Sequence, residues 1–213
     1  MPTFYVSPTG LDANDGLSEL NPWSWARFDS WLPEPGDVIR LRAGSVFPGR
    51  VNWMFREKDV GDPANPILLD RYGDAALADP VVASPGDLQG LAYAGPGGVH
   101  VGAVEFRGRC VADNAVDGLF FGSLDANPVT NVRLSGTKVT GYTRSGVYLH
   151  AGRGVTLVDV RLWGNGKATY LSGIDGLTVL RGEGRGNDWL WSFPGDGGNA
   201  GQGLSVYGCR DVL

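Results

Sequence analysis

One short pattern repeats along the second half of the chain and constrains the fold most. Apolar residues alternate with other residues in segments that begin at Val99, Val132, Val155 and Leu177. The ninth residue after each of these starts is a glycine: Gly108, Gly141, Gly164 and Gly186. With Val212 as a fifth start, successive starts lie 33, 23, 22 and 35 residues apart. Alternation with a period of two predicts strands rather than an amphipathic helix.

A second apolar alternation follows the glycine in each segment. Its members are Leu119 with Phe121, Val147 with Leu149, Leu204 with Val206, and the less regular Tyr170-Leu171. A coil of about 22 residues with glycine at its corners is typical of a parallel β-solenoid. Each coil is too thin to bury its apolar face alone, so its inward residues must stack on the neighbouring coils. A β-sandwich is the alternative, but it would favour short hairpins with Asn-Gly or Asp-Gly turns.

Composition agrees with an all-β chain rich in turns. The 213 residues include 34 glycines, and 42% of the residues are hydrophobic. The net charge is -5 and no basic run occurs, which argues against nucleic acid or an anionic membrane as a partner. No apolar run is long enough to span a membrane. We expect Cys110 and Cys209 to be free thiols, because they fall on different edges of the coil.

The N-terminal residues have neither the charged start nor the apolar core of a signal peptide. We therefore expect either that a signal has been removed or that the protein is made in a cytosol, as virion proteins are. Either origin is consistent with an extracellular or virion-associated protein.

Residues 21–32 form the one predicted helix. Asn21 is in the place of an N-cap, and Pro33 ends the pattern. Trp25, Phe28 and Leu32 share one apolar face. Because a solenoid exposes its core at each end, this helix is expected to act as a lid.

The domain organisation follows from this lid. We expect residues 1–36 to hold an N-terminal strand, a loop and the capping helix, and residues 37–213 to form the rungs. Val212-Leu213 opens a fifth row and stops there. We therefore expect the chain to be a fragment, or that end to be covered by a further domain or by other copies in a homotrimer.

Asp12, Asn14 and Asp15 lie close together in the N-terminal loop. Oxygen ligands at alternate positions suit calcium. Asx residues beside glycine also form ordinary turns, and no glutamate closes an EF-hand. Calcium therefore stays an alternative to no cofactor at all. No His and Cys cluster has the spacing of a metal site.

Several short motifs in the first half of the chain resemble a known group of proteins. They are residues 4–10 with 14–16, residues 35–37 before a strand, residues 44–49, and residues 63–67 with 72–74. Together they resemble the N-terminal portion of right-handed parallel β-helix proteins of the pectate-lyase-like superfamily. The resemblance implies an all-β, right-handed parallel β-helix and a polysaccharide partner, but not one reaction. Gln202 stands where polygalacturonase-type hydrolases carry histidine, which argues against that class.

The residues after the corner glycines suggest a site. Twelve residues after the row starts come Arg144, Lys167 and Trp189, and Asp188 precedes the last of these. Since rungs lie about 4.8 Å apart, Arg144 and Lys167 are expected to be neighbours. Two adjacent cations can bind a uronate carboxylate and acidify the adjacent C–H, and Lys167, with a pKa lowered by Arg144, is the expected base of a β-elimination. Asp188 completes the predicted catalytic set.

The predicted substrate-binding residues come from the same corners and from the segment after Gly186. They are Trp189, Trp191, Tyr142, Asn165 and Asp196. The simpler interpretation is that Arg144 and Lys167 are solvated corner residues paired with Asp188 or Asp113. A hydrolase would instead need two carboxylates about 5–10 Å apart, drawn from Asp188 and Asp196 with Asp113 or Asp117. His100 should point outward, and neither it nor His150 is assigned a role.

The sequence thus favours a carbohydrate-active β-helix, more a polysaccharide lyase than a glycoside hydrolase, acting on an acidic glycan. The alternative is a non-catalytic tailspike-like or surface spike protein that binds glycan or spaces other domains.

Overall fold

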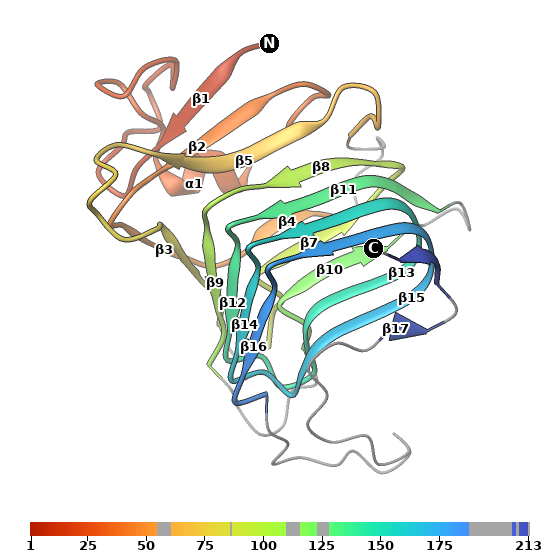
Figure 1. Cartoon of the computed structure of the whole chain (residues 1–213). Helices are drawn as coiled ribbons and strands as arrows, with labels where there is room; N and C mark the ends of the chain where they lie inside the picture. The colour runs from red at the N-terminus through yellow and green to blue at the C-terminus, as the bar shows by residue number, and fades with distance from the viewer. Residues whose placement is uncertain are drawn as a thin grey trace.

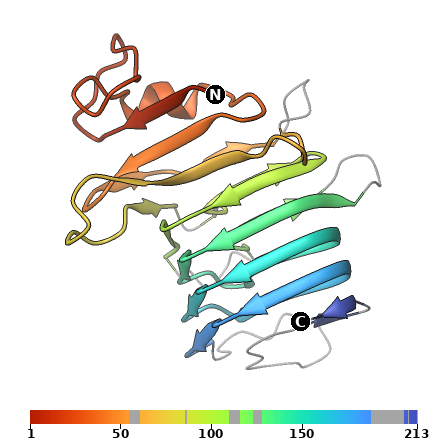
Figure 2. The same ribbon diagram turned by 45° about the horizontal axis from the view of Figure 1, so that its top comes forward.

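A computed structural model describes residues 1–54, 61–85, 87–109, 116–122, 128–187, 206–207 and 209–212. Within these residues every pairing between strands is parallel. The chain winds as a coil whose rungs stack from the N-terminal to the C-terminal end (Figures 1 and 2). The predicted all-β fold, a parallel β-helix with a short N-terminal helix, is confirmed.

The strands form three faces around the core. The first face contains β1 (Thr3–Val6), β2 (Val38–Arg42), β5 (Ile67–Tyr72), β8 (Gly97–Val101), β11 (Val129–Ser135) and β18 (Arg210–Val212). The second face contains β3 (Val46–Pro48), β6 (Val81–Ala83), β9 (Glu105–Arg107), β12 (Lys138–Thr140), β14 (Arg161–Trp163) and β16 (Glu183–Arg185). The third face contains β4 (Val51–Trp53), β7 (Leu91–Ala94), β10 (Leu119–Gly122) and β17 (Val206–Tyr207).

Two long strands link the third face to the first. β13 (Ser145–Val158) pairs with β10 near its start and with β11 from Gly152 onward, and β15 (Lys167–Leu180) follows the same path one rung later. Ala151 and Gly173 have left-handed backbone angles, φ 55° and 63°, where these strands turn the corner. The turn is visible in Figure 1, where both strands wrap around one side of the coil.

The strand register confirms the repeat predicted from sequence. Val99, Val132, Val155, Leu177 and Val212 are direct partners in successive strands of the first face. The first four of these are no more than 1% exposed, so burial between rungs stabilises the stack. On the third face Leu119 pairs with Val147, which pairs with Thr169. Thr169, and not Tyr170, is therefore the inward member of the irregular row.

The corner glycines serve two different purposes. Gly141, Gly164 and Gly186 have φ of 74°, 61° and 53°, where a side chain is strained. Gly108 is not left-handed, but a Cβ there would lie 2.4 Å from the carbonyl oxygen of Gly141. This glycine is required by the close approach of two rungs.

Helix α1 (Trp25–Asp29) is shorter than predicted and begins later. Its N-cap is Ser24, whose side chain accepts a hydrogen bond from the backbone N–H of Arg27, and not Asn21. The reason is that Trp23 is extended: its backbone N–H donates to Tyr5 and its carbonyl accepts from Ser7. The core side of the helix is as predicted, because the buried Phe28 joins the core cluster of the coil.

The Asx residues of the N-terminal loop are engaged in hydrogen bonds within that loop. Asp15 Oδ1 accepts from the backbone N–H of Leu17, and Asn14 Nδ2 donates to the carbonyl of Pro22. Asp12 Oδ1 accepts from the hydroxyl of Ser24. These contacts correspond to the turn interpretation.

Three other expectations concern metals, thiols and membrane spans. Among the residues that the structure describes, no three His, Cys, Asp or Glu side chains are placed to hold a metal ion together. Cys209 forms no disulfide with a described residue. Cys110, the other cysteine of the chain, lies outside the described residues, so the expectation of two free thiols stays a prediction. In the same described ranges, no helix has the length and hydrophobicity to cross a bilayer.

The two kinds of corner glycine predict different costs of substitution. Gly164→Ala should lower the free energy of unfolding by about 1–2 kcal/mol, because no atom lies within 4 Å of the added Cβ and only the backbone is strained. Gly108→Ala should cost more, since two rungs must separate. Urea denaturation of both variants gives the comparison. Equal midpoints, or a less stable Gly164→Ala, would contradict this account.

Candidate functional site

Arg144 and Lys167 are neighbours, but in a different register from the one predicted. Lys167 lies opposite Ser145 rather than opposite Arg144. Four residues separate the paired strands in one rung, between Thr140 and Ser145, and three separate them in the next, between Trp163 and Lys167. The backbone N–H of Lys167 still donates to the carbonyl of Arg144 at 2.7 Å. The two cations therefore lie on adjacent rungs at the same corner.

A buried carboxylate lies beneath these cations. Asp117 is 3% exposed and lies two residues before the first residue of β10. Its Oδ1 accepts from the backbone N–H of Ser145 at 3.1 Å, and its Oδ2 lies 3.5 Å from Nη1 of Arg144. Lys167 is close enough for its positive charge to lower the pKa of the Asp117 carboxyl. We call Asp117, Arg144 and Lys167 the corner cluster.

The position of Asp117 changes its proton affinity. Burial raises the pKa of its carboxyl to about 6, although Arg144, Ser145 and Lys167 all act to lower it. Even when Asp117 is ionised, the corner cluster holds two cations and one anion. When Asp117 is protonated, both cations lack a charged partner within the cluster. The corner cluster is thus suited to bind an anion.

A ladder of aromatic rings lies beside the corner cluster on the outer surface of the third face. Phe120, Tyr148 and Tyr170 occupy successive rungs, with centroid distances of 5.2 and 5.0 Å and interplanar angles of 6° and 5°. All three are half-buried. The guanidinium carbon of Arg144 lies 5.3 Å from the centroid of Tyr148, so the aromatic ladder and the corner cluster form one surface.

The geometry of the aromatic ladder limits how it can contact a ligand. The rings cover one another's faces, and a separation of 5 Å leaves no room for a sugar between them. The ladder therefore offers ring edges and hydroxyl groups. Burial raises the pKa of Tyr148, so its hydroxyl stays protonated and can donate a hydrogen bond.

The aromatic ladder was not among the features predicted from the sequence. A signal was available: Phe120 lies between the inward Leu119 and Phe121, and Tyr148 between Val147 and Leu149. Aromatic residues at outward positions of successive rungs predict a surface ladder.

Two of the predicted substrate-binding residues are structural. Tyr142 is 2% exposed, and its hydroxyl is 2.8 Å from Ser84 Oγ. Asn165 is 1% exposed, accepts from the backbone N–H of Tyr142 and donates to the carbonyl of Val139. Asn187 repeats this arrangement one rung later, so the two asparagines form a ladder that ties the rungs together. Neither Tyr142 nor Asn165 presents a surface to a ligand.

Four predicted residues lie outside the described residues. They are Asp188, Trp189, Trp191 and Asp196, and Asp113, the other expected partner of the cations, also lies outside the described residues. His150 is exposed on the third face, and nothing assigns it a chemical role.

Comparisons with known proteins give one sequence relative and several structures. No protein-family model matches the chain. A lacto-N-biosidase of Bifidobacterium longum subsp. longum is 38% identical over 88 residues, which cover 39% of this chain and 5% of that protein. The chain thus spans a small part of that relative.

The structures are more distant. A GH136 lacto-N-biosidase from Eubacterium ramulus has a TM-score of 0.48 at 18% identity, covering 86% of this chain and 34% of that one. Pectate lyase Pel9A has a TM-score of 0.47 at 18% identity and covers 100% and 62%. A rhamnogalacturonan lyase has a TM-score of 0.46 at 12% identity and covers 99% and 63%.

The asparagine ladder predicts a stability cost. Asn165→Ala leaves the buried carbonyl of Val139 and the N–H of Tyr142 without their partners, so the free energy of unfolding should fall by about 2–4 kcal/mol. Urea denaturation measures it, with Thr156→Ala, an outward residue of the first face, as control. A loss no larger than that of the control would show that the ladder contributes little.

Asp117 predicts a pH dependence of stability. Its pKa is higher in the folded protein than the usual 3.8, so the folded state holds the proton more tightly, and stability is lost as pH rises from about 4 to 6. Asp117→Asn removes this loss while keeping an acceptor for Ser145. We compare the free energy of unfolding of the variant with that of the wild type at each pH. This difference should be up to about 3 kcal/mol more favourable to the variant at pH 7 than at pH 4.

Urea denaturation at the two pH values checks this expectation. Asp175→Asn is the matched control, because the Asp175 side chain is 54% exposed. A difference between Asp117→Asn and wild type that is the same at both pH values would overturn the assignment of a raised pKa.

Proposed function

We propose that this chain belongs to a carbohydrate-active β-helix protein that binds and cleaves an acidic polysaccharide on the outer surface of its third face. The observation that carries the proposal is the corner cluster, where Arg144 and Lys167 surround one buried carboxyl beside the aromatic ladder. The excess of cations suits a uronate carboxylate. The tyrosine hydroxyls of the ladder suit sugar hydroxyl groups. An extracellular or virion-associated location is part of the proposal.

The sequence relative supports the class of substrate. Its name is that of a glycoside hydrolase, which favours a glycan as the partner of this chain. The relative does not indicate whether this chain catalyses hydrolysis or elimination, because the match covers 5% of that protein.

We favour β-elimination over hydrolysis for the reaction. A hydrolase needs a second carboxyl close to the first. The groups that act on the pKa of Asp117 are Arg144, Ser145 and Lys167, and no second carboxyl of the described residues is among them. Two cations and one titratable group match elimination better: the cations neutralise the uronate carboxylate, which acidifies the adjacent C–H.

The corner cluster also changes the role that we propose for Lys167. The side chain of Lys167 is near the buried carboxyl of Asp117 and lies on the rung next to Arg144, so it contributes a second positive charge at the same corner. We therefore assign Lys167 and Arg144 to charge neutralisation. Asp117, with a pKa raised to about 6, is the group of the cluster suited to proton transfer near neutral pH.

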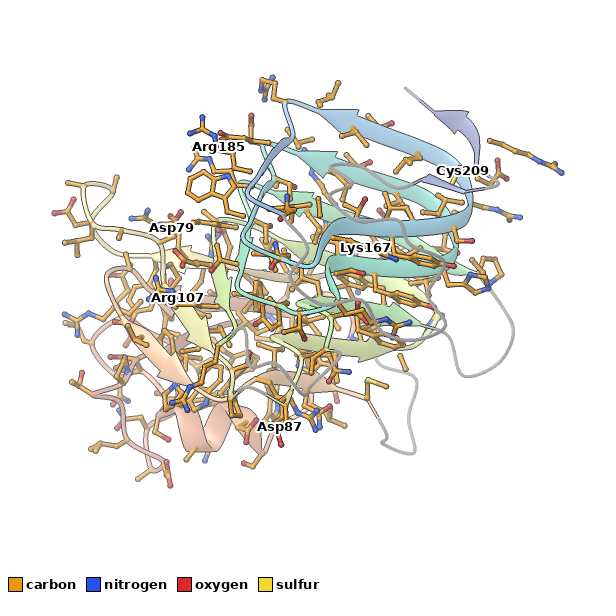
Figure 3. All side chains as sticks on the ribbon, turned by 90° about the horizontal axis from the view of Figure 1, so that it is seen from below. Asp79, Asp87, Arg107, Lys167, Arg185 and Cys209 are labelled. Atoms are coloured by element: carbon orange, nitrogen blue, oxygen red, sulfur yellow. The ribbon has the colours of Figure 1, made fainter. Side chains whose placement is uncertain are left out.

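Substitutions of Lys167 separate the two roles. Lys167→Arg keeps the charge but cannot act as a base, and should retain activity within about tenfold. Lys167→Ala and Arg144→Gln should each lose about 100-fold or more. The assay mixes the protein with polygalacturonate or alginate and follows the ultraviolet absorbance of unsaturated uronides. Arg185→Gln is the control, because Arg185 lies on another side of the coil from Lys167 (Figure 3).

The outcomes discriminate among the alternatives. An inactive Lys167→Arg with normal binding would return the base role to Lys167. New reducing ends without absorbance would identify a hydrolase. Binding that needs Arg144 but yields no product would identify the non-catalytic spike, and the absence of both binding and product would contradict the proposal.

A further inference from the structure

A polar hollow lies on the first face of the coil, whereas the aromatic ladder lies on the third face. It has a volume of about 290 Å³ and is lined from β5, β8 and β11. Its polar members are Asp70, His100, Arg133 and Ser135, and Gly102 lies among them. His100 and Arg133 are direct partners on adjacent strands. The volume suits a single ring rather than an oligosaccharide.

Gly102 keeps the hollow open. A Cβ at this position would lie 2.3 Å from Oδ1 of Asp70, so any side chain would displace that carboxylate. Asp70 is held firmly: Oδ1 accepts from the backbone N–H groups of Arg71 and Ala103 at 2.8 and 3.0 Å, and Oδ2 pairs with Nη1 of Arg40 at 3.0 Å. The hollow thus has a preorganised acceptor on its wall.

A second acceptor comes from His100. Asn131 Nδ2 donates to the carbonyl of Pro63 at 2.7 Å, so its Oδ1 remains to accept a hydrogen bond from His100 Nε2 at 3.0 Å. This arrangement places the proton of the neutral imidazole on Nε2 and leaves Nδ1 as an acceptor.

Arg133 supplies positive charge. Its side chain is exposed, and among the described residues no carboxylate lies within ion-pair distance of it. The charge of Asp70 is matched by Arg40, so Arg133 leaves the hollow with an uncompensated cation. A guanidinium binds a carboxylate through two parallel hydrogen bonds.

We propose that this hollow binds one compact sugar acid, with Arg133 on the carboxylate and with Asp70 and His100 accepting hydrogen bonds from sugar hydroxyls. The inference rests on the proposed function for the class of ligand only. The site itself is separate, because it lies on the first face, away from the corner cluster. The combination of one cation with two fixed acceptors distinguishes a sugar acid from a neutral sugar and from a simple anion.

The test is a titration followed by ¹H–¹⁵N correlation spectra. The probes are D-galacturonate and N-acetylneuraminate, two sources of the same chemistry, with D-galactose and acetate as controls. We expect saturable shifts of the amides of Val101, Gly102 and Ala103 with at least one sugar acid, and affinity at least about tenfold weaker for galactose and for acetate. Arg133→Gln should weaken binding of the sugar acid by about tenfold or more.

Arg153→Gln is the matched control, because Arg153 is an exposed arginine of the first face that pairs with Asp175. It should leave the affinity unchanged. Equal affinity for galactose and galacturonate, an unchanged Arg133→Gln, or no saturable shift with either acid would overturn the proposal.

The same experiment separates this site from the corner cluster. Arg144→Gln and Lys167→Ala should not alter the titration, whereas Arg133→Gln should not alter binding at the third face. Failure of the polysaccharide assay would therefore leave the sugar-acid titration as an independent result.

Discussion

The stacking of one rung on the next is the constraint on which this structure depends. Parallel backbone hydrogen bonds hold adjacent strands about 4.8 Å apart, so the nearest neighbours of a residue are those one coil away in sequence. In the interior this spacing produces columns of apolar side chains. At the surface and corners it produces the aromatic ladder, the asparagine ladder and the corner cluster.

Burial explains which parts of the fold could be predicted. A position such as Val132 must be apolar in every rung, because it packs between Val99 and Val155. That requirement repeats along the chain and can be read without coordinates. The short helix shows what burial patterns do not predict. Asn21 has the sequence features of an N-cap, but the backbone of Trp23 pairs with the first strand instead, so the helix begins later. This pairing joins segments that are distant in sequence and leaves no local pattern.

The corners and the surface were harder to predict for a physical reason. A corner glycine marks where a turn begins, but no apolar pattern marks where the next strand starts. The column through Arg144 and Lys167 was therefore wrong by one residue, although both residues do lie on neighbouring rungs. The sugar-acid hollow depends on a missing side chain, at Gly102, and on the orientation of Asn131, neither of which leaves a periodic signal.

The unequal corners before β13 and β15 have a consequence for how such a molecule can diverge. The chain re-enters the sheet after the shorter corner with its backbone hydrogen bonds to the previous rung intact, from Gly166 to Tyr142 and from Lys167 to Arg144. The difference of one residue is absorbed within the bend, because Val147 and Thr169 are still direct partners and both are buried inside the coil. What changes is which corner residues lie opposite each other: Lys167 lies opposite Ser145 rather than opposite Arg144. Length variation at one bend is thus a route by which descendants of this chain can acquire new surface chemistry while the column of valines and leucines beneath stays the same.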